Sequence, residues 1–181
     1  MNSHELSLRE KNVVLIGFMG VGKTTIGKHV AEKLHRSFID ADNAIEEAFG
    51  MSPSKVFAEY GEKVFRDKER EIITKLCTER KHHVISLGGG AFIQEEIKKV
   101  CMDNCIVIYL DLSWGNWKDR IGLIMDSRPV LQGRSLEEIE ELFYQRKEYY
   151  AAHHLKIETD KQDPEEVATQ IVDSLTDLGA I

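Results

Sequence analysis

The chain has 181 residues, of which 42% are hydrophobic and 30% charged, and this composition suits one globular domain with a sizeable core. Its formal net charge of −7 argues against a protein that binds nucleic acid over a broad basic surface. The sequence has no run of about 18 apolar residues, so we expect no membrane span and no membrane partner.

The N-terminal sequence MNSHELSLREKN is polar and lacks the apolar segment of a secretory signal. Three cysteines, Cys77, Cys101 and Cys105, form no CxxC pair and are typical of thiols in a reducing compartment. We therefore expect a cytoplasmic protein, and we expect it to act as a monomer.

Five short, mainly apolar runs predict strands that lie buried in a parallel sheet. The expected strands are residues 12–17, 37–42, 83–90, 105–112 and 155–160. Between the first two runs, apolar residues recur at helical spacing. The residues that carry this spacing are Ile26, Val30, Ala31 and Leu34.

Helical patterns fill the other intervals. Residues 43–80 predict two or three helices, and one helix each is expected over 91–101, 113–124 and 135–151. Ser135 and Glu138 form a capping box at the start of the fourth interval. The last helix is expected from Pro164, with Asp163 as its cap.

Strands that alternate with helices predict a three-layer α/β/α domain with a five-stranded parallel sheet. The sequence contains no internal repeat and no linker, so a single domain is expected over residues 1–181. Residues 125–135 are rich in turn formers, show no periodicity and include two arginines. We expect this segment to be a mobile lid.

Residues 17–25, GFMGVGKTT, contain the complete G-x-x-x-x-G-K-[ST] pattern between an expected strand and an expected helix. Glycines in such a loop turn backbone N–H groups toward an anion, and the helix N-terminus adds a partial positive charge. Lys23 can reach the β- and γ-phosphates of a nucleotide, and the Thr24 hydroxyl can ligate Mg²⁺. The alternative interpretation is a glycine-rich turn that merely caps a helix.

Two carboxylates, Asp40 and Asp42, end the second expected strand and would share a face if that strand continued. Ligands of parallel α/β sheets lie at the carboxyl ends of strands. One carboxylate could hold Mg²⁺ through water, and the other could accept a hydrogen bond or a proton from an attacking hydroxyl. Alternatively, Asp42 only caps a helix that starts at Asn43.

Three charged residues fall on apolar helical faces. Arg66 and Glu69 lie three residues apart on or beside the inward face of their helix, where they can pair, or they form a partly solvated surface pair. Arg146 falls within the stripe of Ile139, Leu142, Phe143 and Tyr150. An arginine there must either extend to solvent or face a buried anion.

The third expected strand ends in SLGGGA, in which Gly88, Gly89 and Gly90 let a ligand approach the main chain closely, unless they form a plain tight turn. In the expected lid, Arg128 precedes Pro129 and could close over a transferred phosphate, although a lone loop arginine is more often solvated.

GFMGVGKTT, DAD, GEKVFRDKE, SLGGGA, RPVL and QRKEYY occur in this order, and the ordered set resembles the shikimate kinase family over residues 10–178. The resemblance implies a P-loop fold like that of nucleoside monophosphate kinases, with a substrate-binding helical region at about 42–80 and a lid at about 125–135. It implies ATP and Mg²⁺ as cofactors and shikimate as the substrate. The implied reaction transfers the γ-phosphate of ATP to the 3-hydroxyl of shikimate, on the way to chorismate and the aromatic amino acids.

The resemblance also implies roles for individual residues. The ATP phosphates would contact Gly20, Val21, Gly22, Lys23, Thr24, Thr25 and the lid residue Arg128, and Mg²⁺ would be held by Thr24 and Asp40. Shikimate would be bound by Asp42, Arg66, Glu69, Gly88, Gly89, Gly90 and Arg146. Lys23, Asp42 and Arg128 would be catalytic, and Arg120 and Gln162 are expected near the adenine.

Three rivals share the phosphate loop. A GTPase is disfavoured because no D-x-x-G follows an expected strand, and Asp160 in TDKQD stands where guanine recognition needs Asn or Thr. Another metabolite kinase, for gluconate or a nucleoside monophosphate, remains the enzymatic alternative, although it has less need of both Arg66 and Arg146. A regulatory domain that has lost its chemistry finds no support, because all the expected catalytic residues are present.

Overall fold

The computed structural model describes residues 7–120 and 133–181. Its centre is a five-stranded, wholly parallel sheet in the order β2-β3-β1-β4-β5. The strands are β1 (Val13–Ile16), β2 (Ser37–Asp40), β3 (His83–Ser86), β4 (Ile106–Asp111) and β5 (Leu155–Glu158). All five lie within the expected runs, so the predicted three-layer α/β/α class is confirmed.

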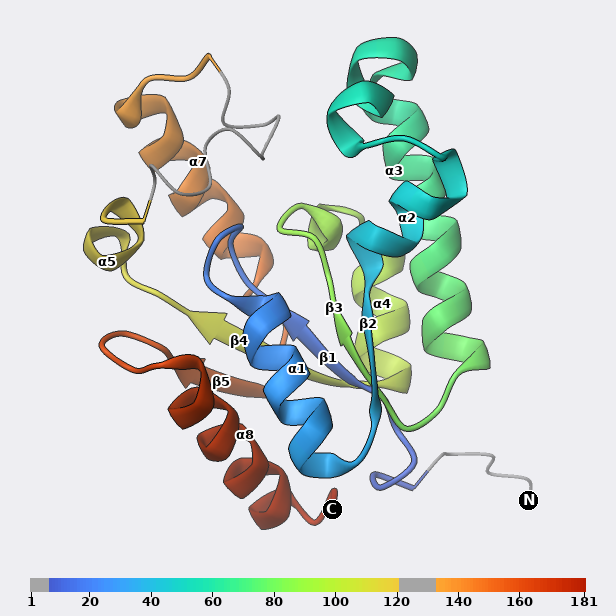
Figure 1. The fold of residues 1–181 in the computed structure, drawn as a ribbon, viewed down its shortest axis with the longest axis vertical. Coiled ribbons are helices and arrows are strands. Elements are labelled where there is room, and N and C mark those ends of the chain that lie inside the picture. Colours follow the sequence, from blue (N-terminus) through green and yellow to red (C-terminus); the bar gives the residue numbers. More distant parts are fainter. Residues whose placement is uncertain (1–6, 121–132) are drawn as a thin grey trace.

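Helices cover both faces of this sheet, as Figure 1 shows. In front lie α1 (Lys23–Leu34) and α8 (Pro164–Leu178), which pack against each other, and behind it lies α4 (Glu95–Asn104), which packs against α3 (Pro53–Glu79). The remaining elements are α2 (Ala41–Phe49), the 3₁₀ turn η1 (Ala91–Ile93), α5 (Trp114–Lys118) and α7 (Leu136–Tyr149).

The burial of the strands follows their place in the sheet. Every residue of β1 is buried and five of the six residues of β4 are buried, because both strands lie between two neighbours and beneath helices on both faces. The edge strands β2 and β5 are more exposed. The most apolar runs of the sequence therefore form the middle of the core.

The helix boundaries match the local signals in the sequence. The Ser135 hydroxyl accepts from the Glu138 N–H at 3.2 Å, and Asp163 caps α8 by accepting from the Glu166 N–H at 2.8 Å. Gly61 has φ 85° and ψ 168°, which interrupts α3 and leaves two helical pieces. The interval 43–80 thus contains α2 and a broken α3, as expected for two or three helices.

Several expected boundaries were wrong, including the end of the third strand, which lies at Ser86 and not at Gly90. Two further shifts concern the starts of helices. The second strand ends at Asp40, two residues early, because helix α2 begins at Ala41. The helix expected over 91–101 is a short 3₁₀ turn followed by α4, which begins at Glu95. Both shifts move residues near the carboxyl end of the sheet, where the expected ligand site lies.

The three cysteines are buried and are not joined by disulfide bonds. The Sγ atoms of Cys77 and Cys101 lie 3.7 Å apart, between α3 and α4. The hydrogen bond with Cys101, and then burial, raise the pKa of the Cys77 thiol, so Cys77 packs as a neutral, apolar side chain. Within residues 7–120 and 133–181, no helix has both the length and the apolar character that a membrane span requires.

Candidate functional site

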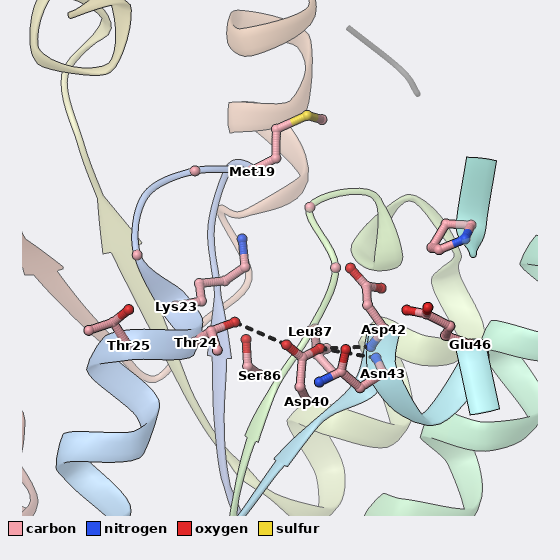
Figure 2. A pocket seen from close by; sticks show the side chains of 15 residues that line it. Met19, Lys23, Thr24, Thr25, Asp40, Asp42, Asn43, Glu46, Ser86 and Leu87 are labelled. Carbon is pink, nitrogen blue, oxygen red and sulfur yellow. Dashed lines mark hydrogen bonds between the residues drawn. The ribbon is translucent and has the colours of Figure 1, made fainter. Parts of the chain in front are cut away.

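A cavity of about 420 Å³ opens at the carboxyl ends of β1, β2 and β3, within the usual size range of small-molecule sites. It is lined by the loop after β1, the first turns of α1 and α2, and the segment after β3. The lining residues that the sequence also indicated are Gly20, Gly22, Lys23, Thr24, Thr25, Asp40, Asp42, Gly88 and Gly89. Figure 2 shows Lys23 and Thr24 on the α1 side of this cavity and Asp42 on the α2 side.

The loop after β1 has the backbone of an anion site. Gly22 adopts φ 100° and serves as the N-cap of α1, a conformation that a side chain would strain. The first turn of α1 contains no acidic residue that could compete for its N–H groups. Lys23 is 8% exposed, and its ammonium group donates to the carbonyl oxygens of Gly17 and Phe18 at 2.7 and 3.0 Å. A cation and a helix N-terminus therefore meet at one end of the cavity.

An aromatic cluster supports this loop from behind. The indole N–H of the fully buried Trp117 donates to the Met19 carbonyl at 2.6 Å. The Phe18 ring packs edge-on against Trp117 and against Phe143, with centroid distances of 5.1 Å in each case. Trp117 thus packs in the core, and its N–H holds the phosphate loop in place.

Asp40 links the two helices that flank the cavity. One carboxylate oxygen accepts from the Thr24 hydroxyl at 3.0 Å, and the other accepts from the Asp42 N–H at 2.9 Å, which caps α2 (Figure 2). The suggestion that Asp42 caps this helix was wrong, because the helix starts two residues before Asn43. Asp42 instead occupies the first turn of α2, so the two carboxylates do not share a strand face.

The oxygen donors at Thr24 and Asp40 fit a magnesium ion that is only partly held by protein. Mg²⁺ prefers oxygen ligands and usually keeps several waters, with one or two carboxylates and phosphate oxygens completing the shell. Among the described residues, no group of three or more His, Cys, Asp or Glu side chains could hold a metal by itself. These two side chains thus suit a metal that arrives with a nucleotide.

Arg66 and Glu69 form a mostly buried pair, so the surface-pair interpretation was wrong. Arg66 Nη1 lies 2.8 Å from Glu69 Oε1, and the exposed fractions of these side chains are 15% and 1%. Burial raises the pKa of Glu69, and the neighbouring guanidinium only partly opposes this rise. Nearby Asp42 also raises the pKa of Glu69, so the pair lies close to the α2 wall of the cavity.

Arg146 is 5% exposed, so it does not extend to solvent. Its Nε finds no hydrogen-bond acceptor among the residues that the structure describes. Burial lowers the pKa of Arg146, and the positive charge of Arg66 lowers it further. Two guanidinium groups therefore lie near each other, an arrangement that can bind a carboxylate.

The glycine triplet forms the surface on which these groups meet. A Cβ added to Gly88 would lie 2.6 Å from an Asp42 carboxylate oxygen, and one added to Gly90 would lie 2.5 Å from an Arg66 nitrogen. At Gly89 the corresponding distance to Arg146 Nη1 is 3.5 Å. Successive glycines thus contact an acid and two arginines, which a plain tight turn would not require.

Arg120 and Gln162, which are expected near the adenine, lie outside this cavity. Arg120 follows α5, and Gln162 lies in the β5–α8 loop, where its amide donates to the Glu158 carbonyl at 2.7 Å. Neither lines the cavity, although their segments are joined by the Ser113 N–H, which donates to Asp160 at 2.9 Å. Arg128 and most of the expected lid lie outside the described residues, so the structure leaves both expectations as they stand.

Two residues at the site had no expected role. The buried Tyr150 hydroxyl donates to the Gly89 carbonyl, and burial raises its pKa and keeps it protonated. Gln94 binds Arg66 and Glu69 from the start of α4. Tyr150 stood in the apolar stripe four residues after Arg146, so its spacing was visible but its hydroxyl contact was not. Nothing in the local sequence around Gln94, residues 94–96, indicates the contact that its side chain makes.

Comparison with known proteins identifies the family. The shikimate kinase family model matches residues 19–176. A shikimate kinase of Oceanobacillus iheyensis is 55% identical over 93% of this chain and 91% of its own. A shikimate kinase of Bacillus subtilis is 53% identical over 94% of this chain and 91% of its own.

Solved structures agree with this assignment. The shikimate kinase from Acinetobacter baumannii, determined in complex with shikimate, superposes with a TM-score of 0.85 and 31% identity, over 92% of this chain and 93% of that one. A gluconokinase from Sinorhizobium meliloti has a TM-score of 0.55 at 15% identity and so shares only the fold. The gluconate and nucleoside monophosphate alternatives are not favoured, and this chain belongs to the shikimate kinase family, the enzymes that use ATP to phosphorylate the 3-hydroxyl of shikimate.

Proposed function

We propose that each end of the site binds one of the two substrates of this kinase reaction. The phosphates of ATP lie on residues 20–25, against the N-terminus of α1. Shikimate lies against α2, α3 and the glycine triplet. The observation that carries this division is the buried Arg146 beside Arg66, because Glu69 pairs with Arg66 while Arg146 Nε has no acceptor among the described residues and can bind an anionic ligand.

The groups at the end formed by α2, α3 and the glycine triplet complement shikimate, which has one carboxylate and three hydroxyls. Arg66 and Arg146 bind the carboxylate, and Glu69 holds Arg66 in position. Asp42 and the main chain of Gly88, Gly89 and Gly90 contact the hydroxyls. Planar guanidinium groups bind carboxylates in fixed orientations, so this arrangement sets which hydroxyl faces the ATP.

Phosphoryl transfer depends on positioning and on neutralising charge more than on covalent catalysis. Asp42 accepts a hydrogen bond from the attacking 3-hydroxyl and aligns its oxygen with the γ-phosphorus. The oxygen–phosphorus bond forms as the bond to the leaving ADP breaks, and the proton of the hydroxyl passes to the Asp42 carboxylate. Lys23 stabilises the negative charge of the β- and γ-phosphates, and Arg128 in the lid at about 125–135 contributes a second positive charge.

Mg²⁺ bound between Thr24 and Asp40 would neutralise phosphate charge. Thr24 and Asp40 would hold the ion, with Asp40 acting through water. The hydrogen bond that now joins these two side chains supports the proposal, because it keeps two oxygen donors together at the start of α1. Titrating MgCl₂ in the wild type and in Thr24→Ala tests it, with a higher Mg²⁺ requirement expected in the variant.

Three further expectations are part of the proposal. Arg120 and Gln162 flank the adenine, the helical region at about 42–80 carries the shikimate site, and the protein acts as a cytoplasmic monomer. Size-exclusion chromatography with light scattering tests the oligomeric state, where a mass near 20.7 kDa is expected. A measured mass of twice this value would contradict the expected monomer.

A coupled assay for ADP release tests the proposed substrate site. Shikimate, quinate, gluconate and nucleoside monophosphates are offered in turn at fixed ATP. We expect shikimate to give the highest kcat/KM, because only shikimate and quinate carry a carboxylate on a hydroxylated ring. A gluconate rate equal to the shikimate rate would contradict the proposed recognition of a carboxylate on a hydroxylated ring.

A further inference from the structure

The side chain of Gln94 reaches across from α4 to the arginine helix. Gln94 is the N-cap residue of α4, yet within the described residues its side chain makes no capping hydrogen bond to that helix. Its amide nitrogen instead donates to the Arg66 carbonyl at 3.0 Å and to Glu69 Oε1 at 3.1 Å. Both acceptors lie on α3, which runs beside α4 in Figure 1.

The surrounding groups fix the direction of this amide. The Arg66 carbonyl and the ionised Glu69 carboxylate can only accept, so they require the NH₂ end of Gln94. On the other side, Arg70 Nη1 donates to Gln94 Oε1 at 3.4 Å. A reversed amide would place its oxygen against two acceptors and its nitrogen against a cation, so one orientation is strongly favoured.

Glu69 needs this support because it is buried. The side chain is 1% exposed. Its Oε1 accepts one hydrogen bond from the Arg66 guanidinium and another from the Gln94 amide. Hydrogen bonds to the ionised form favour it, and here they oppose the burial that raises the pKa of Glu69. Gln94 thus helps to keep Glu69 charged and pointed at Arg66.

The segment that begins at the glycine triplet therefore holds Arg66 at two points. The main chain of Gly90 lies against the guanidinium group, and Gln94, four residues later, binds the backbone carbonyl of Arg66 and the partner of its guanidinium. The triplet and α3 are tied together by one short stretch of chain. The position of the arginine relative to the triplet is thereby set.

We propose that Gln94 is a positioning residue for shikimate, which acts through Glu69 on the guanidinium group of Arg66. This inference rests on the proposed roles of Arg66 and Glu69. Gln94 itself does not touch the substrate or ATP. Its loss should weaken the binding of the shikimate carboxylate and leave the ATP end of the site unchanged.

Gln94→Met tests the inference with a side chain of similar length that cannot form the hydrogen bonds. We expect the KM for shikimate to rise roughly tenfold, the size of a lost hydrogen bond to a charged group, while the KM for ATP changes less than about twofold. Gln170→Met, on the exposed face of α8, is the matched control and should change neither constant. A shikimate KM that stays within about twofold of wild type in a folded Gln94→Met protein would overturn the proposal, as would an equal rise in both KM values.

Gln94→Glu provides a second test, which also decides the question if the methionine variant fails to fold. At neutral pH the new carboxyl group faces Glu69, so the shikimate KM should exceed that of the wild type. As the pH is lowered toward about 5.5, the new group takes up a proton and can donate to Glu69, and the ratio of variant to wild-type KM should fall. A ratio that does not change with pH would overturn the proposal. The charged groups around this position include Asp42 on α2, Glu62, Arg66, Asp67, Glu69 and Arg70 on α3, and Arg146 on α7.

Arg66→Ala separates failure of this inference from failure of the proposed function. If Arg66→Ala raises the shikimate KM and Gln94→Met does not, only the role of Gln94 is wrong. If neither variant raises it, the carboxylate site itself has been misassigned.

Discussion

The guanidinium group of Arg66 lies against the main chain of Gly90, so that a Cβ on Gly90 would approach its Nη2 to 2.5 Å. Real Cβ atoms do not come this close to other heavy atoms, so any larger residue must displace the arginine. Gly90 has φ −103°, which other residues can adopt. This glycine is therefore required by contact with Arg66 and not by the backbone.

Gly90→Ala should weaken shikimate binding without unfolding the protein. The methyl group pushes a flexible side-chain end, so the free energy of unfolding should change little. The KM for shikimate should rise about tenfold and that for ATP should not, as steady-state kinetics can measure. Gly115→Ala on α5 is the control, since a Cβ there meets no atom within 4 Å. An unchanged shikimate KM in Gly90→Ala would argue against the role of Arg66.

Asp42→Asn should abolish most turnover and leave ATP binding nearly intact. The amide keeps the shape of the carboxylate but loses the charge that attracts the attacking hydroxyl, so kcat should fall by at least about 100-fold. ATP affinity, measured by calorimetric titration, should stay within about twofold. Turnover like that of the wild type would remove Asp42 from the mechanism.

Arg146→Ala should raise the KM for shikimate by about 30-fold or more, because a buried charge partner of the carboxylate is lost. Stability should not fall in parallel, since the arginine is desolvated and its Nε has no acceptor among the described residues. Lysine should not restore function, because it lacks the planar fork. Kinetics and urea denaturation of both variants provide the measurement. A shikimate KM equal to that of the wild type would contradict the carboxylate role.

The stability of the protein should depend on pH through Glu69. Its pKa is raised in the folded state, so between the unfolded and folded pKa values the folded protein binds the extra proton. The resulting stability is fully present below 4.5, the ordinary pKa of a glutamate side chain, and is lost as the pH rises through the folded pKa. Relative to Glu69→Gln, whose side chain does not titrate, the wild type should gain stability as the pH falls from 7 toward about 4.5. Urea unfolding across this range measures it, and a constant difference would contradict it.

Trp117→Phe should affect the end of the site that binds ATP. The ring is retained, but the Met19 carbonyl loses its donor in a buried position, which should destabilise the protein by about 1–3 kcal/mol. The phosphate loop is then less firmly held, so the KM for ATP should rise more than the KM for shikimate. Urea denaturation and a two-substrate kinetic analysis provide the measurements. A selective rise in the shikimate KM would show that this cluster does not support the ATP end.

The sequence by itself determined the features that depend on neighbouring residues. The phosphate loop at 17–25 lies between a strand and a helix because its glycines and the flanking periodicities are contiguous. Ser135 and Asp163 cap their helices through bonds that span three residues. Helical spacing also placed Glu69 and Arg146 on or beside apolar faces, but it left open whether they reach solvent, and the structure shows that both are buried.

Only the tertiary structure decided which of these residues meet. The sequence offered only Asp42 as a cap, whereas Asp40 caps α2 because β2 ends at Asp40 and the helix begins at Ala41. The contacts of Gly88 with Asp42, Gly89 with Arg146 and Gly90 with Arg66 join segments that are distant in the chain. They arise because β2, β3 and β1 are neighbours and deliver their carboxyl ends to one edge. Gln94 illustrates the same reason, because its partners on α3 lie 25 and 28 residues away and no local pattern encodes such a bond.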